Sequence, residues 1–159
     1  MNASSIHVAM LSYYFRPSYS GSAVQALNLA RRLAGMGVST RFLSANLTNS
    51  APHELIEGMP LARLNVGSNR NLQIPAFWLR LAWALIRDRS SIDIIHAHGT
   101  LQHTIASIVG RILGKPTILK IAMAQSDLAF ERQGRLAGRI NRYFVRRFDR
   151  FIATSTEVY

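Results

Sequence analysis

The sequence predicts an α/β domain in which short buried strands alternate with helices around a mostly parallel sheet. Three observations support this fold class. Apolar runs of strand length recur along the chain, a helical apolar period follows most of them, and glycines close several helical stretches. Alternation of this kind implies right-handed crossovers and a parallel sheet covered on both faces. The fold is therefore expected to be Rossmann-like and doubly wound, with helices on both faces.

The expected strands share a run of four to eight mostly apolar residues. They lie at 6–11, 38–45, 61–66, 92–97, 116–122 and 150–154. The expected helices share an apolar stripe at a spacing of three and four residues. They run from Ala23 to a stop at Gly35 and Gly37, from a first turn at Pro75 to about Ile86, over 101–113, and through an arginine-rich stretch to about Arg147. Between 46 and 60 we expect a polar loop.

Length and composition indicate one domain. The chain has 159 residues, of which 48% are hydrophobic and 17% charged, so it can bury a core. It contains no cysteine, which excludes disulfides and thiolate metal sites. After the last strand, Ser155 to Tyr159 read as the start of a helix. We therefore expect residues 1–159 to be a single Rossmann-like domain cut from a longer protein.

Basic residues outnumber acidic ones, 19 to 8, which gives a net charge of +11. A balance of this kind favours an anionic partner, although an arginine-rich composition alone would also produce it. Part of the charge forms a stripe at helical spacing. Its members are Arg132, Arg135, Arg139, Arg142 and Arg146. The stripe predicts contact with an anionic membrane or an acidic surface, and its alternative is a solvated helix face. Nucleic acid is disfavoured because Tyr143 and Phe144 are too few aromatics beside it.

In doubly wound folds, ligands bind beyond the carboxyl ends of the strands. The loop after the first strand ends in Gly21 and Ser22, directly before a helix. Helix amino ends favour anions, and small residues let a phosphate approach the backbone. We therefore expect these two residues to bind phosphate, and the alternative is an ordinary strand-to-helix turn.

Two histidines and a glycine lie at the carboxyl end of the strand expected at 92–97. They are His96, His98 and Gly99. The histidines point to the same side of the strand, but a pair without a third ligand is weak evidence for zinc, and we predict no metal site. His98 is expected to donate a hydrogen bond or shuttle a proton in the cleft. Its alternative is a structural histidine that satisfies backbone groups.

The next strand also carries polar residues toward the same edge. Lys120 lies inside the strand, so it is either buried and paired or directed at an anion. Asp127 follows as a candidate base or hydroxyl acceptor, with a helix N-cap as the alternative. Together with Gly21, Ser22 and Gly99, Lys120 is assigned to substrate or donor-phosphate binding.

Five segments in order resemble a known family. They are the helix from Ala23 to Leu33, the GMGVST segment at 35–40, DIIHAHG at 93–99, GKPTIL at 114–119 and DRFIATS at 149–155. This order is similar to the amino-terminal, acceptor-side domain of a retaining GT-B glycosyltransferase of family 4. The resemblance covers nearly the whole chain.

The resemblance implies a complete enzyme with two facing domains, the second of which binds a UDP- or GDP-linked sugar. It implies no other cofactor and no obligatory metal. Gly21 and Ser22 match the family's glycine pair, with Ser in place of the second glycine, and His98 matches the second histidine of its strand end. Many members carry a further histidine where this chain has Ala122, and Lys120 with Asp127 are similar to another version of the site.

On this interpretation the complete enzyme transfers a sugar to a sugar, lipid-linked or other acceptor, in polysaccharide, glycolipid or glycoconjugate synthesis. It would lie in the cytoplasm, peripheral to the inner face of the cell membrane. The 159-residue chain alone would be inactive because it lacks the donor domain. The alternative function is a non-catalytic binding module, or the docking subunit of a two-chain transferase.

Overall fold

The computed structural model describes residues 5–18, 20–99, 101–121 and 136–153. Within this part of the chain, seven strands form one sheet in the order β3-β4-β2-β1-β5-β6-β7. The strands are β1 His7–Leu11, β2 Ser39–Asn46, β3 His53–Ile56, β4 Met59–Asn65, β5 Ile94–His98, β6 Thr117–Ile121 and β7 Arg150–Ala153. Neighbouring strands are parallel except for the β3–β4 hairpin at one edge. The predicted fold class is confirmed.

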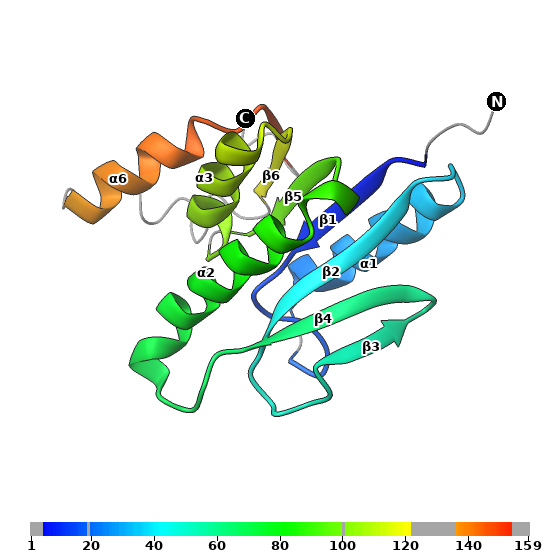
Figure 1. Ribbon diagram of the computed structural model, residues 1–159, viewed down its shortest axis with the longest axis horizontal. Helices are drawn as coiled ribbons and strands as arrows, with labels where there is room; N and C mark the ends of the chain where they lie inside the picture. The colour runs from blue at the N-terminus through cyan, green and yellow to red at the C-terminus, as the bar shows by residue number, and fades with distance from the viewer. Residues whose placement is uncertain (1–4, 19, 100, 122–135, 154–159) are drawn as a thin grey trace.

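Helices cover both faces of the sheet. They are α1 Gly21–Ala34, α2 Arg70–Arg87, α3 His103–Leu113 and α6 Leu136–Val145, with a 3-10 turn at Arg89–Ser91. In Figure 1, α2, α3 and α6 lie side by side in front of the sheet and α1 lies behind it. Because side chains alternate between the faces of a strand, each face has its own core. Phe42 and Leu27 belong to the core under α1, whereas Phe77, Leu81 and Leu119 belong to the core under the other three helices.

The strand order reverses at β1, which lies between β2 and β5. From β1 the chain passes through α1 to β2, and from β5 it passes through α3, on the opposite face, to β6. The two connections therefore leave the carboxyl ends of β1 and β5 in opposite directions. In α/β folds such a divergence marks the crevice where ligands bind. The switch point of this chain therefore lies between residues 12–18 and residues 99, 101 and 102.

The expectation of a polar loop from 46 to 60 is wrong, because this stretch contains β3. Glu57 and Gly58 join β3 to β4 with φ values of 54° and 80°, as a two-residue hairpin turn with two positive φ angles requires. Of the four β3 residues only Ile56 is buried, so the strand has no alternating apolar pattern.

Two helices begin earlier than their patterns indicate. α1 starts at Gly21 because the Ser20 hydroxyl caps it, accepting a hydrogen bond from the Ala23 amide at 3.1 Å. α2 starts at Arg70, where the Asn69 side chain is the cap. Pro75 therefore lies inside α2 rather than in its first turn, and the capping asparagine marks the true start.

Candidate functional site

The amino end of α1 lies at the switch point, directly after the β1 loop. Gly21 and Ser22 form its first turn, where backbone amides have no partner within the helix. A Cβ built on Gly21 would meet no atom within 4 Å. Glycine is therefore not required there by packing within the protein, and the space beside it is open. The two residues therefore lie inside the first turn of the helix rather than directly before it, at an end that favours anions.

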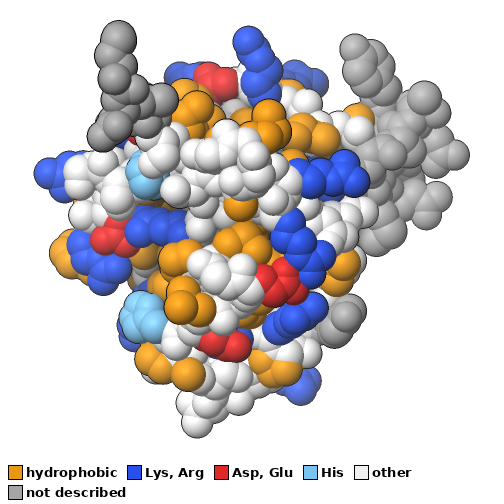
Figure 2. Space-filling model, turned by 90° about the vertical axis from the view of Figure 1, so that its right-hand side faces the viewer, with side chains coloured by type: hydrophobic (Ala, Val, Ile, Leu, Met, Phe, Trp, Pro, Cys, Tyr) orange, Lys and Arg blue, Asp and Glu red, His pale blue; other side chains and the backbone are white. Residues whose placement is uncertain are grey.

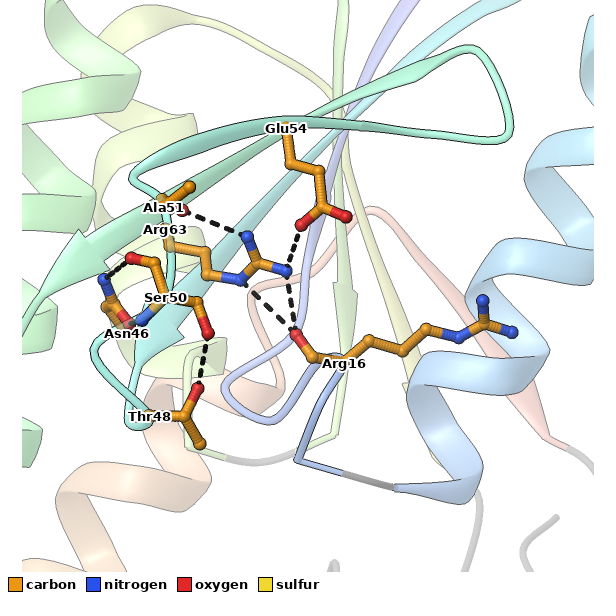
Figure 3. Close-up of polar contacts among 7 residues, drawn as sticks. All are labelled: Arg16, Asn46, Thr48, Ser50, Ala51, Glu54 and Arg63. Carbon is orange, nitrogen blue, oxygen red and sulfur yellow. Dashed lines mark hydrogen bonds and ion pairs between the residues drawn. The ribbon is translucent and has the colours of Figure 1, made fainter.

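A buried arginine fixes the loop between β1 and α1. Arg63 on β4 is only 6% exposed, and its guanidinium donates two hydrogen bonds to the Arg16 carbonyl at 3.0 and 3.3 Å. It also donates to the Ala51 carbonyl at 3.0 Å and pairs with Glu54 at 2.6 Å. Figure 3 shows how these contacts tie the β1 loop to the hairpin segment. The sequence gives no sign of this role, because an arginine in an alternating strand usually points to solvent.

His98 ends β5 beside the switch point, and its side chain is 2% exposed. Its ring lies 4.1 Å from the ring of His96, centroid to centroid. Neither ring nitrogen of His98 has a hydrogen-bond partner among the described residues. Burial, reinforced by His96 and Lys120, holds the pKa of His98 well below its usual value, and burial lowers that of His96 to about 4. Both imidazoles are therefore neutral at pH 7.

Lys120 lies beside His98 in the sheet, paired with it in the β5–β6 register. It is half-buried, and desolvation lowers the pKa of its ammonium group. The structure therefore brings His98 and Lys120 together at one end of the sheet, as the strand pattern predicts. A partly desolvated cation therefore lies beside two neutral imidazoles, and groups of this kind can hydrogen-bond a hydroxyl or pair with an anion.

Gly99 turns the chain sharply out of β5, with a φ of +94° that favours glycine. Three residues later Gln102, 1% exposed, spans the switch point with its side-chain amide. The amide nitrogen donates to the Leu11 carbonyl of β1 at 3.1 Å and to the His98 carbonyl of β5. Gln102 thus joins the two strand ends that define the crevice. Sequence reasoning missed it, because a glutamine before a helix resembles an ordinary exposed polar residue.

Residues 20–159 match the glycosyl transferase 4-like domain family. The chain belongs to this family. No curated protein matches the chain.

Solved structures show the same fold as this glycosyl transferase 4-like domain. Sucrose-phosphate synthase from Thermosynechococcus elongatus matches with a TM-score of 0.68 at 16% identity, over 94% of this chain and 42% of that one. MurG from Acinetobacter baumannii matches with a TM-score of 0.62 at 16% identity, over 97% of this chain and 43% of that one. Arabidopsis thaliana UGT89C1, solved in complex with UDP, matches with a TM-score of 0.65 at 12% identity, over 96% of this chain and 45% of that one. The chain thus has the fold of one half of a GT-B glycosyltransferase and spans less than half the length of each structure.

Three of the predicted site residues, Asp127, Arg132 and Arg135, lie outside the described residues. The other three arginines of the stripe, Arg139, Arg142 and Arg146, line a groove between α6 and α3. Residues 148 and 149, which lead into the start of β7, line the same groove. These three arginines are therefore separate from the switch point, which lies at the carboxyl ends of the strands.

In the part of the chain that the structure describes, no third histidine, cysteine or carboxylate joins His96 and His98 to complete a metal site. The helices of that part are all too short or too polar to cross a bilayer.

Proposed function

We propose that this domain is the acceptor-side half of a glycosyltransferase that moves a sugar from a UDP- or GDP-linked donor to an acceptor hydroxyl with retention of configuration. One observation carries the proposal. The switch point of a glycosyl transferase 4-like domain places an open helix amino end beside a neutral, unbonded imidazole and a partly desolvated lysine. These groups match the two parts of the substrate, a diphosphate and a polyhydroxyl sugar.

Gly21 and Ser22 serve the anionic part in this proposal. Their amides face outward at the positive end of α1, and the open space beside Gly21 admits a phosphate oxygen close to the backbone. Ser22 has a small side chain and adds a hydroxyl group, whose oxygen lies 3.0 Å from the hydroxyl oxygen of Ser20. The Arg63 contacts with Arg16 hold the preceding loop, so the helix end is positioned before a ligand arrives.

His98 serves the sugar in this proposal. A neutral imidazole can donate one hydrogen bond and accept another, which suits a hydroxyl group. Burial costs free energy for a polar ring without partners, and a bound hydroxyl would offset that cost. Gln102 fixes the strand end that carries the ring, Gly99 turns the chain away from it, and Lys120 supplies a positive charge nearby. Asp127 remains the proposed base or hydroxyl acceptor.

The complete enzyme needs a second domain in this proposal. The related structures are more than twice as long as this chain, so a facing domain would hold the nucleotide, and the chain alone would not transfer sugar. We place the enzyme on the cytoplasmic side of the cell membrane, in synthesis of cell-surface polysaccharide, glycolipid or glycoconjugate.

The proposal is tested with the full-length protein and a panel of UDP- and GDP-sugars. Products are measured by mass spectrometry and their anomeric configuration by NMR. We expect one donor to be transferred to a hydroxyl acceptor with its configuration retained, and the 159-residue chain to be inactive. Inverted products would reject the retaining mechanism. Binding of nucleotide-sugars without transfer to any acceptor would support the non-catalytic module instead.

A further inference from the structure

A basic groove of about 680 Å³ lies between α3 and α6, at the opposite end of the sheet from the switch point. Five arginines line it. They are Arg111 from the last turn of α3, with Arg139, Arg142, Arg146 and Arg147 from α6 and the residues just after it. Tyr143, Phe148 and Asp149 complete the lining. Two segments far apart in the sequence therefore direct guanidinium groups to one concave surface.

Among the described residues, the one acid that lines this groove is already engaged. The Asp149 carboxylate accepts hydrogen bonds from the Thr117 amide at 2.7 Å and from the Thr117 hydroxyl at 2.8 Å. These bonds hold the pKa of Asp149 below its usual value, with a smaller contribution from Arg111. The carboxylate anchors the start of β7 to β6. Among the described residues that line the groove, five guanidinium groups therefore lie with one carboxylate, which is bonded to Thr117.

Some arginines outside the groove pair with acids, although others, such as Arg32 and Arg80, have no acid within ion-pair distance among the described residues. Arg31 pairs with Glu57, Arg41 with Asp88 at 2.8 Å, and Arg87 with Asp88 at 2.7 Å. The face in Figure 2 illustrates the pattern, with acidic side chains interspersed among basic ones. For Arg111, Arg139 and Arg146 the described residues likewise provide no acid within ion-pair distance, and these three arginines share one groove.

We propose that this groove binds a phosphate-type oxyanion. The planar fork of arginine matches two oxygens of a phosphate, and several such forks in one concavity mutually repel until an anion enters. Arg147 lies 3.9 Å above the centre of the Tyr143 ring, so one guanidinium is fixed by stacking on the groove wall. The groove is separate from the transfer site, and its ligand does not depend on the proposed transfer.

The phosphate can come from a lipid headgroup or from a soluble phosphate. The three-helix layer that carries the groove also exposes large apolar side chains on its neighbouring helices. Leu79 is 74% exposed, Trp83 66% and Ile112 70%. Basic and apolar side chains on one layer are typical of surfaces that rest on anionic membranes, so vesicles form the first arm of the test and pyrophosphate the second.

The experiment compares the full-length protein with two double variants of equal net charge. R139Q/R146Q removes two exposed groove arginines, and R31Q/R32Q removes two exposed arginines of α1, on the opposite face of the sheet. Vesicle sedimentation uses phosphatidylcholine with and without phosphatidylglycerol, and isothermal titration uses pyrophosphate. Circular dichroism and thermal unfolding establish that both variants are folded.

We expect R139Q/R146Q to bind at least one of these anions about twentyfold more weakly, as the loss of two arginine contacts near an anionic surface implies. The control variant should stay within about threefold of the wild type. If R139Q/R146Q binds only the vesicles more weakly, the ligand of the groove is a lipid headgroup. If it binds only pyrophosphate more weakly, the ligand is a soluble phosphate. Equal losses of affinity in the two variants would show that the effect comes from net charge alone, and this result would overturn the proposal. Binding of neither anion by the wild type would also overturn it.

Discussion

Replacing Gln102 with methionine tests how the two strand ends of the crevice are held together. Methionine has nearly the same volume as glutamine and no amide, so the packing cost is small. The Leu11 and His98 carbonyls each lose a donor while they stay buried. An unsatisfied buried polar group costs about 1–3 kcal/mol. Since carbonyls retain a second acceptor site, we expect Q102M to lower the free energy of unfolding by about 2–4 kcal/mol.

The assay is urea-induced unfolding of the chain at pH 7, followed by circular dichroism. Gln25→Met on the exposed face of α1 is the matched control, and it should stay within about 0.5 kcal/mol of the wild type. In the full-length enzyme, Q102M should also slow sugar transfer, because the strand end that carries His98 loses its anchor. If Q102M is as stable as the Gln25 control, the amide does not hold the crevice and this explanation of the site is refuted.

Three further predictions follow from local geometry. Gly110→Ala would place its Cβ 2.2 Å from Thr117 Cγ2, so overpacking should cost about 2 kcal/mol and lower the melting temperature by about 4–8 °C. Gly21→Ala meets no atom within 4 Å, so calorimetry should show unchanged stability while the full-length enzyme loses transfer rate; a normal rate would remove Gly21 from phosphate binding. His96, with its pKa lowered to about 4, should make the folded chain lose stability as the pH falls from about 6.5 to about 4, because the unfolded state takes up the proton first. The contribution of His96 to this loss reaches about 3 kcal/mol. Acid unfolding of His96→Leu, which keeps the contribution of His98, should show a loss that is smaller by that amount.

The fold was predictable because most of its helices and strands have a recognisable pattern in the local sequence. Buried strands read as apolar runs, and the rule that ligands bind at the carboxyl ends of strands placed His98 and Lys120 at the same edge. Strand β3 was not predicted because three of its four residues are exposed. Its turn residues, Glu57 and Gly58, are only a weak indication of a hairpin. Such short edge strands form through pairing with a neighbour rather than through their own pattern.

The missed site residues are those whose role depends on distant partners. Gln102 bonds to Leu11, 91 positions away, and Arg63 bonds to Arg16, 47 positions away. Neither contact leaves a periodic mark in the sequence. The groove has the same origin. The stripe on α6 was visible, but the contribution of Arg111 from α3 required knowledge of how the two helices pack.

The central claim is that the carboxyl edge of the sheet is where sugar is transferred. The most direct test is the kcat/KM for sugar transfer of the full-length His98→Ala variant, compared with His53→Ala on the exposed strand β3. We predict a loss of about a hundredfold or more for His98→Ala, the range of a positioned acid, base or hydrogen-bond donor, and none for His53→Ala. A folded His98→Ala variant that transfers sugar at the wild-type rate would contradict the claim.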